Sequence, residues 1–355
     1  MKCMLVKDHG NIDALDDILY MSQNWPRPKR GKGQTLIRVQ ACSLAPGDVR
    51  TMSGMTKFVQ MPKSGFPYIP GGDVVGIVEE EDPESNKFRV GDCVVARFHD
   101  TPSGGLAEYC AVKTSLAAIK PESISTIEAA ALPASVVVAV IVVQTWVRQG
   151  DRVLVLGATG GVGSHVVQLL KGRGASFVAA AARDVSILDA RHVDRTIDYT
   201  KESWWDTPEF KASKFDLILD FAAFPHAWAN CGSVLKTGAQ GGRFITTAGD
   251  TPYFQVLSMR DVCGLLIKLF GRSCWTGCAG RSVPKYSWFI GGLSDPITDE
   301  TWAMVFKAIE EGHLKPCLDP SGPFPFSEAG VRQAFALQAG RHAHGKVVIS
   351  GITDC

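Results

Sequence analysis

The sequence predicts an α/β protein with two domains: a doubly wound parallel sheet covered by helices, and a smaller domain built mainly of β-strands. Three observations lead to this prediction. The first part of the chain, up to about residue 125, reads as short strands separated by Gly, Pro and Asp. After Ser125, strands and helices alternate. A glycine-rich turn joins an apolar strand to an amphipathic helix in VLVLGATGGVGSHVVQLLKGRGA, residues 153–175.

Length, charge and cysteine content limit the class of protein. The chain has 355 residues, of which 45% are hydrophobic, enough to fill two cores. A net charge of +1 predicts no broad basic surface for nucleic acid. No apolar run reaches the roughly 20 residues that span a bilayer, so we expect no membrane insertion. The segment MKCMLVKDHG resembles neither a signal nor a transit peptide, and we expect a cytoplasmic location.

The ten cysteines are scattered and show no CxxC spacing, which predicts mostly reduced thiols, several of them buried. Cys274 and Cys278 in CWTGC are the closest pair, and a redox or metal role for them stays open. His342 and His344 in RHAHGK could pair on a metal, but two imidazoles beside a lysine are more typical of a surface.

Strands are expected in the first part of the chain where apolar residues alternate or cluster between turn residues. They are TLIRVQAC (35–42), DVVGIVEEE (73–81) and CVVARF (93–98), with VGDCV (90–94) as a turn. The segment 125–150 is long, apolar and mostly helical, and Ser125 with Glu128 forms a possible capping box at its start.

The middle of the chain is expected to alternate between strands and helices. The strands are 152–158, 176–182, 215–222 and 242–249, and the helices are 161–174, 184–193 and 227–238. Two further helices, 299–314 and 327–340, and a terminal strand, GKVVIS (345–350), complete the chain.

The glycine turn is typical of a dinucleotide-binding site. Gly157, Gly160 and Gly163 form GxxGxxG with Gly161 between them. The first glycine allows a tight turn, the middle ones let backbone N–H groups approach a pyrophosphate, and the last permits close packing of helix on strand. The helix N-terminus adds positive potential. A turn needed only for packing is the alternative. No GK[ST] follows, which excludes a Walker P-loop.

The residues after the next strand bear on the choice of cofactor. An acid about 20 residues past the turn usually binds the ribose hydroxyls of NAD. Arg183 stands at that distance, and a cation there suits the 2′-phosphate of NADPH. Asp184 follows directly and could serve NAD instead, and Arg183 could be a solvated residue only. The sequence favours NADPH.

These motifs together resemble the medium-chain dehydrogenase/reductase superfamily, in its zinc-free quinone oxidoreductase branch. The likeness covers nearly the whole chain. VQACSLAPGDVRTMSG, PYIPGGDVVGIVEE, GDCVVARF, GGLAEY, AAALPASVVVAV, GATGGVG, TIDYT and HGKVVI follow in the order of that family. KYSWFIGG and the spacing after it resemble the reticulon-4-interacting protein 1-like group.

The resemblance implies a GroES-like β-barrel catalytic domain, residues 1–127 and 292–355, around a Rossmann domain, residues 128–291. It implies NADPH between the two domains, and a homodimer joined along YSWFIGG at the sheet edge. The residues that we expect to bind the cofactor are Gly157, Ala158, Thr159, Gly160, Gly161, Val162, Gly163, Ala182, Arg183, Tyr199, Ala248, Gly249, Phe289 and Lys346.

The same resemblance predicts that the site lacks a catalytic zinc. Alcohol dehydrogenases of the superfamily hold zinc on a cysteine and a histidine, whose positions look like Ala45 and Gly72. Neither can bind a metal, and the lobe with four closely spaced cysteines is missing. Without zinc to stabilise an alkoxide, the favoured acceptor delocalises its own developing charge, as a quinone or an enone does.

No general acid is obvious from the sequence. Arg50 and Thr51 are the candidate donors to the acceptor, with a surface ion pair as the alternative for Arg50. Asp48 matches a family aspartate and is expected to be structural. The prediction is an NADPH-dependent reductase of a quinone or an activated alkene. The alternatives are an enoyl-thioester reductase, which the absence of a tyrosine between Gly54 and Tyr68 disfavours, and a low-turnover NADPH-binding regulatory protein.

Overall fold

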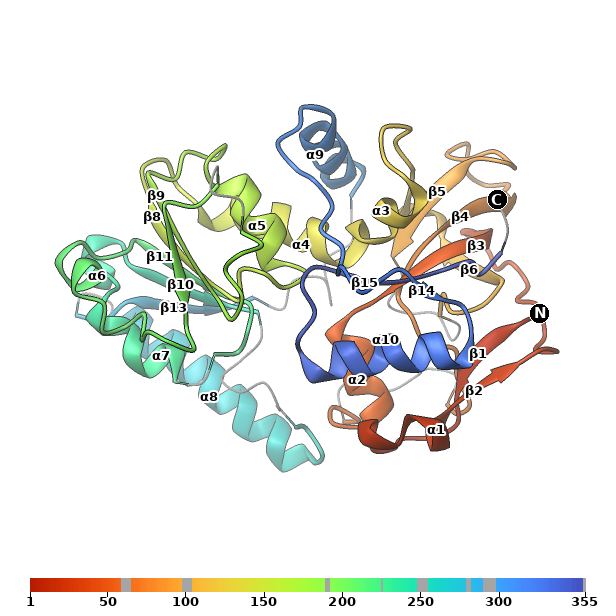
Figure 1. Ribbon diagram of the computed structural model, residues 1–355, viewed down its shortest axis with the longest axis horizontal. Coiled ribbons are helices and arrows are strands. Elements are labelled where there is room, and N and C mark those ends of the chain that lie inside the picture. The colour runs from red at the N-terminus through yellow and green to blue at the C-terminus, as the bar shows by residue number, and fades with distance from the viewer. Residues whose placement is uncertain are drawn as a thin grey trace. The chain divides into compact units, whose positions relative to one another are not determined.

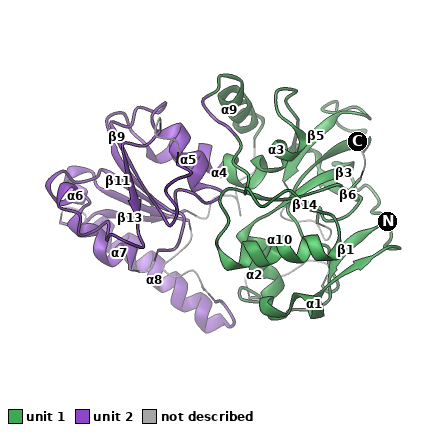
Figure 2. Cartoon of the chain, viewed as in Figure 1, with its two compact units in different colours: residues 1–137, 295–312, 316–355 green, residues 138–294, 313–315 purple. Residues whose placement is uncertain are grey.

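The computed structural model describes residues 1–58, 65–97, 104–188, 192–224, 226–247, 255–278, 282–289 and 298–353. The chain forms two compact units (Figures 1 and 2). Unit 1 contains residues 1–137, 295–312 and 316–355, and unit 2 contains residues 138–294 and 313–315. The domain boundaries expected from the sequence, 127/128 and 291/292, stay a prediction. None of the described helices is both long and apolar enough to cross a membrane.

Unit 1 is built on a seven-stranded, mainly antiparallel sheet in the order β14-β15-β3-β4-β5-β7, with β6 also paired to β3. The strands expected from alternation are present as β3, β4 and β5. The sheet strands are β3 (Gln34–Leu44), β4 (Asp73–Glu80), β5 (Cys93–Arg97), β6 (Tyr109–Lys113), β7 (Ala117–Ile119), β14 (Phe324–Pro325) and β15 (Val347–Ser350). β15, the strand predicted in GKVVIS, is antiparallel to β3.

The other elements of unit 1 cover its sheet. A separate antiparallel pair, β1 (Cys3–Val6) and β2 (Leu19–Ser22), shares one buried cluster with residues of β3, β4 and β15. The helices are α1 (Leu15–Ile18), α2 (Pro46–Ser53), α3 (Thr126–Ala130), α9 (Asp299–Glu310) and α10 (Glu328–Gly340). The predicted capping box is confirmed at α3, where the Ser125 hydroxyl accepts from the Glu128 N–H and Glu128 accepts from the Ser125 N–H.

Unit 2 is a parallel six-stranded sheet in the order β10-β9-β8-β11-β12-β13. Numbered within the unit this order is 3-2-1-4-5-6, that of a Rossmann domain, so the fold class predicted from the sequence is confirmed. The strands are β8 (Arg152–Leu156), β9 (Phe177–Ala182), β10 (Arg195–Asp198), β11 (Leu217–Asp220), β12 (Arg243–Thr246) and β13 (Lys285–Trp288).

Helices cover both faces of this sheet because successive strand residues point to opposite sides. Val153 and Val155 of β8 share one buried cluster with α4 and α5, whereas Leu154 and Leu156 share another with residues of α6, α7 and α8. A strand buried on both faces is a continuous apolar run, which is what the sequence shows. The helices are α4 (Leu132–Trp146), which begins in unit 1, α5 (Gly163–Leu170), α6 (Pro208–Ala212), α7 (Ala227–Asn230) and α8 (Met259–Cys278).

Two helix predictions in this unit are wrong. The predicted helix 184–193 lies only partly in the described residues. Residues 184–188, which are described, are not helical. The Asp184 Oδ1 accepts from both the N–H and the hydroxyl of Ser186, at 2.9 and 2.6 Å. An aspartate that bonds the backbone two residues ahead favours a turn over a helix. The predicted helix 227–238 is only α7 followed by a 3₁₀ turn, Cys231–Ser233.

Candidate functional site

The glycine turn joins β8 to α5, and two of its glycines are required by close contacts. Gly157 has a φ of +78°, and its N–H and that of Ala158 donate to the Ala181 carbonyl at 3.0 and 3.1 Å. A Cβ on Gly163 would lie 2.2 Å from the Gly157 oxygen. A Cβ on Gly160 would lie 3.5 Å from the same oxygen, an ordinary contact. Packing therefore explains Gly157 and Gly163 but not Gly160.

The turn also presents N–H donors to which the described part of the chain offers no acceptor. Among the described residues, no acceptor lies within hydrogen-bonding distance of the N–H groups of Thr159, Gly161 and Val162. The Gly161 carbonyl is 2.6 Å from Nδ1 of the fully buried His165. Adjacent unused N–H groups at a helix N-terminus suit a phosphate group. The residues present thus fit the pyrophosphate of a dinucleotide.

Next to the turn, the ends of β9 and β10 place Arg183 and Tyr199 close together. Ala182 and Asp198 are register partners, and the Tyr199 N–H donates to the Ala182 carbonyl at 3.2 Å. Arg183 is exposed, and the ring of half-buried Tyr199 packs edge-on against Phe224 at 5.1 Å. Both residues thus follow neighbouring strands at the same end of the sheet, and their joint binding of one anionic group stays a prediction.

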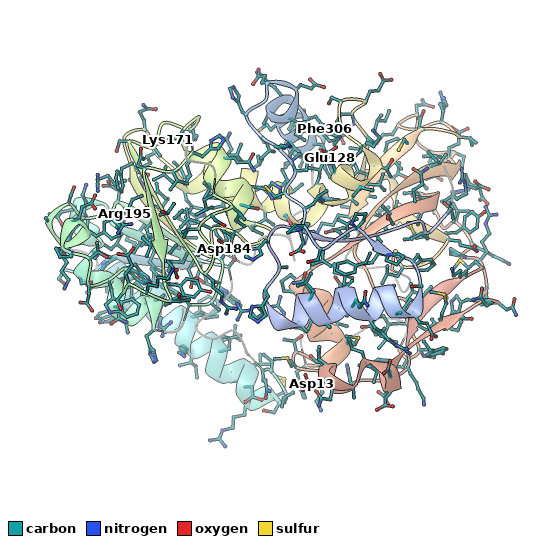
Figure 3. All side chains as sticks on the ribbon, in the orientation of Figure 1. Asp13, Glu128, Lys171, Asp184, Arg195 and Phe306 are labelled. Atoms are coloured by element: carbon teal, nitrogen blue, oxygen red, sulfur yellow. The ribbon has the colours of Figure 1, made fainter. Side chains whose placement is uncertain are left out.

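Asp184, labelled in Figure 3, competes with Arg183 for the cofactor assignment. One of its oxygens accepts two bonds from Ser186, so this carboxylate stabilises its own turn. In a dinucleotide-binding fold, an acid near this place hydrogen-bonds the ribose 2′-hydroxyl of NAD. The choice of Arg183 over Asp184 as the residue that faces the cofactor stays a prediction.

The remaining predicted cofactor residues lie in different parts of the chain. Ala248 and Gly249 lie outside the described residues. Phe289 is half-buried, and its N–H donates to the Thr246 carbonyl at 2.9 Å. Lys346, in unit 1, is buried, and its Nζ donates to the Leu44 carbonyl at 2.7 Å and to Asp73 at 3.1 Å. The cofactor roles of all four stay predictions.

In unit 1, the residues predicted to contact the electron acceptor lie on α2. Asp48 Oδ2 accepts from the Ala45 N–H at 2.8 Å, and its Oδ1 accepts from the Gly71 N–H at 3.1 Å. Asp48 therefore ties the start of α2 to the segment before β4, as expected for a structural aspartate. Burial is the main cause that raises the pKa of Asp48 to about 6, against the lowering effect of the two backbone bonds.

Arg50 and Thr51 are half-buried on the same helix. Burial lowers the pKa of Arg50, and the nearby charge of Arg341 lowers it further, whereas Asp48 raises it. Ala45 is the N-cap residue of α2, and its methyl group and the bare backbone of Gly72 supply no metal ligand. No three His, Cys, Asp or Glu residues of the described chain form a group that could bind a metal ion.

Two polar groups that were not among the predicted site residues also lie near Asp48. The Tyr68 hydroxyl and Arg97 Nη1 are buried, and neither has a hydrogen-bond partner within the described ranges. Burial has the largest effect on both, raising the pKa of the tyrosine and lowering the pKa of the arginine, while the charge of Asp48 raises both values. A buried donor without an acceptor is unfavourable by about 1–3 kcal/mol, so a polar ligand atom would be stabilised there. Tyr68 lies in PYIPGGD, a motif that had signalled only the family.

Comparison with known proteins identifies the family. The family described as "Alcohol dehydrogenase GroES-like domain" matches residues 31–122, and the family described as "Zinc-binding dehydrogenase" matches residues 188–349. The chain is 33% identical to "NADPH-dependent alkenal/one oxidoreductase, chloroplastic" of Arabidopsis thaliana, over 98% of this chain and 79% of that protein. It is 32% identical to "2-methylene-furan-3-one reductase" of Solanum lycopersicum, over 99% and 79%.

Solved structures agree on the fold along the whole chain. The quinone oxidoreductase from Coxiella burnetii, 24% identical, superposes with a TM-score of 0.76 over 99% of each chain. The quinone oxidoreductase from Thermus thermophilus, whose structure was also solved in complex with NADPH, is 25% identical with a TM-score of 0.69, over 99% of this chain and all of that one.

Proposed function

The chain belongs to the zinc-independent quinone oxidoreductase and alkenal/one oxidoreductase branch of the medium-chain dehydrogenase/reductase superfamily, and from this premise we propose that it transfers hydride from NADPH to a quinone or an enone. The coarser statement, an NAD(P)H-dependent oxidoreductase of the quinone or alkenal reductase type, follows from the relatives. The observation that carries the finer proposal is that the turn has N–H groups without an acceptor among the described residues, and that Arg183 and Tyr199 follow the two neighbouring strands.

Different residues of the chain have different roles in such a reaction. NADPH, when bound, supplies the hydride. The N–H groups of the glycine turn bind the pyrophosphate, and Arg183 and Tyr199 bind the 2′-phosphate. An enone that accepts hydride at its β-carbon becomes an enolate, and a quinone becomes a hydroquinone anion. Both spread the negative charge onto oxygen, so that hydrogen-bond donors can replace a metal ion.

The reaction also consumes one proton, which completes the saturated ketone or the hydroquinone. Arg50 and Thr51 are our expected donors to the acceptor oxygen, and the unpartnered hydroxyl of Tyr68 supports adding it to them. Ala45 and Gly72 leave no ligands for a catalytic zinc at the positions used by alcohol dehydrogenases. A simple alcohol is therefore a poor substrate in this proposal.

The decisive test is oxidation of NADPH, followed at 340 nm, with benzoquinones, naphthoquinones, enones and crotonyl-CoA. We expect turnover with the quinones or enones and little with crotonyl-CoA. Gly160→Asp is the negative control, because it should lose the cofactor. Preference for crotonyl-CoA would establish an enoyl-thioester reductase instead. Tight NADPH binding without turnover of any acceptor would favour a regulatory protein.

We also propose a homodimer joined through β13. Among the described strands, β13 lies at one edge of the six-stranded sheet and pairs only with β12. An open edge is prone to pair with another chain. Light scattering at micromolar concentration should give twice the mass of one chain, and a mass of 38.2 kDa would refute the dimer. A cytoplasmic location stays a proposal, since relatives are named as chloroplastic or mitochondrial.

A further inference from the structure

The longest helix of unit 2, α8, is apolar on two opposite sides. Its inner side packs on the sheet, because Leu269 and Thr276 are buried and Leu265 contacts the cluster on that face. The Thr276 hydroxyl accepts from the Tyr286 N–H of β13 at 3.3 Å, which fixes the helix to the sheet edge. Figure 1 shows α8 at the margin of the unit.

The second apolar side faces solvent, and we call it the outer stripe. With 3.6 residues per turn, its members fall within roughly one third of the circumference of the helix. The exposed fraction is 73% for Ile267, 65% for Phe270, 59% for Met259 and 42% for Leu266. The outer stripe consists of Met259, Cys263, Leu266, Ile267, Phe270, Cys274 and Cys278. A folded protein rarely leaves so long an apolar strip exposed unless the strip binds something.

The charges of α8 indicate what this stripe binds. The helix contains three cations, Arg260, Lys268 and Arg272, and one carboxylate, Asp261. Arg260 and Lys268 are exposed, whereas Arg272 lies over the ring of Tyr286 at 5.4 Å. Trp275, 54% exposed, lies beside the stripe on the same side as the two exposed cations. Cations and an indole next to an apolar stripe are typical of helices that lie in a membrane interface.

A second copy of the chain would meet this surface less well. In a twofold pairing of two α8 helices, each copy would bring two exposed cations, Arg260 and Lys268, and one carboxylate, Asp261. The pair would then carry four exposed cations against two carboxylates. This excess of one sign opposes the pairing, whereas an anionic lipid surface attracts the cations.

We propose that α8 docks unit 2 on an anionic membrane surface through the outer stripe. The inference rests on the proposed function and deepens it, because a hydrophobic quinone or a long-chain enone dissolves in the bilayer rather than in water. Docking of this kind is peripheral. The apolar side chains enter the boundary between headgroups and acyl chains, while Arg260 and Lys268 reach the phosphates.

The experiment is flotation of the full-length protein with vesicles of phosphatidylcholine alone or of phosphatidylcholine with phosphatidylglycerol. The wild type should float with the anionic vesicles and less with the neutral ones. The double variant Ile267→Glu/Phe270→Glu should lower the partition coefficient at least about tenfold, since two apolar groups are lost and two negative charges are gained. Val90→Glu is the matched control, because Val90 is 64% exposed but lies in unit 1. It should float like the wild type.

Other outcomes decide against the proposal. Equal flotation of the double variant and the wild type would overturn it. So would failure of the wild type to float together with a halved mass of the double variant in light scattering, because a second copy would then cover the stripe. Turnover of a water-soluble benzoquinone should be the same in all three proteins. Absence of that turnover in the wild type would refute the proposed function, whereas flotation would still support the docking surface.

Discussion

Three substitutions in the glycine turn separate its role in packing from its role in cofactor binding. Gly160→Asp adds a carboxylate at a position where a Cβ meets only the Gly157 oxygen, at 3.5 Å. The folded chain should tolerate this group. Gly160→Ala adds the Cβ without the charge. Gly163→Ala, in contrast, places a Cβ 2.2 Å from the Gly157 oxygen and 3.0 Å from the Ala158 Cα, so the turn itself must move.

The expected magnitudes follow from these distances and from the charge of the pyrophosphate. A carboxylate about 5 Å from a phosphate charge is repelled by about 3 kcal/mol at an effective dielectric constant of about 20. Two phosphate charges double this energy, and solvent screening of a half-exposed turn halves it again. About 3 kcal/mol corresponds to roughly a hundredfold weaker affinity for NADPH. Gly160→Ala should weaken affinity by less than about tenfold. Gly163→Ala should lower the free energy of unfolding by at least about 2 kcal/mol.

The assay combines titration of NADPH, followed by its fluorescence, with thermal unfolding in the absence of cofactor. Gly160→Asp and Gly160→Ala should unfold at similar temperatures but differ strongly in affinity for NADPH. Gly163→Ala should unfold at a lower temperature. Equal affinities of the two Gly160 variants would show that the pyrophosphate is not bound at this turn.

Three further predictions concern the cofactor, a buried carboxyl group and zinc. Arg183→Ala should raise KM for NADPH about tenfold or more and leave KM for NADH almost unchanged, because a charge-assisted bond contributes about 1.5–3 kcal/mol. Parallel kcat/KM values of Arg183→Ala and Asp184→Ala with both cofactors decide between the two residues. A wild-type preference for NADH would reject Arg183. The raised pKa of Asp48, about 6, means that its protonated form stabilises the fold at low pH and that this stability is lost as pH rises from about 4 to 6. Urea unfolding should therefore show that the free energy of unfolding falls from pH 4 to pH 7 by up to about 3 kcal/mol more in the wild type than in Asp48→Asn. Equal falls in the two proteins would contradict this prediction. Because Ala45 and Gly72 offer no ligand, elemental analysis should find no stoichiometric zinc, and one tightly bound zinc per chain would refute this.

Local sequence patterns predicted most of the fold because local forces determine those elements. The run VLVL before the glycine turn is apolar at every position, as a strand covered on both faces requires, and it is β8. Ser125 and Glu128 satisfy the first N–H groups of α3 through side chains three residues apart. Such short-range signals do not depend on the rest of the chain.

The helix predicted from residue 184 shows where local patterns fail. Its apolar spacing suits a helix, but two hydrogen bonds from Ser186 to Asp184 stabilise a competing turn. Helix α8 shows a different limit. No helix was predicted at residues 259–278, and only the structure shows a helix there with one apolar side toward solvent.

The candidate site was predictable only in part, because it gathers residues distant in sequence. The glycine turn has a motif, and Arg183 follows it at a fixed spacing. Tyr68 and Arg97 lie in segments that signalled only the family, PYIPGGD and GDCVVARF, and their position near Asp48 depends on the pairing of strands in unit 1. The register of β4 with β5, which sets Asp73 opposite Arg97, cannot be derived from alternation alone.

The antiparallel pairing of β15 with β3 has a consequence for the order in which the protein matures on the ribosome. Unit 2 is almost continuous in sequence, so its sheet can assemble while the last residues are still being synthesised. Unit 1 cannot complete its sheet at that time, because β15, which pairs with β3, lies about 300 residues later in the chain. Until Lys346 emerges, Asp73 lacks the ammonium group that neutralises it in the folded protein, and one side of β3 is open to chaperones or to other nascent chains.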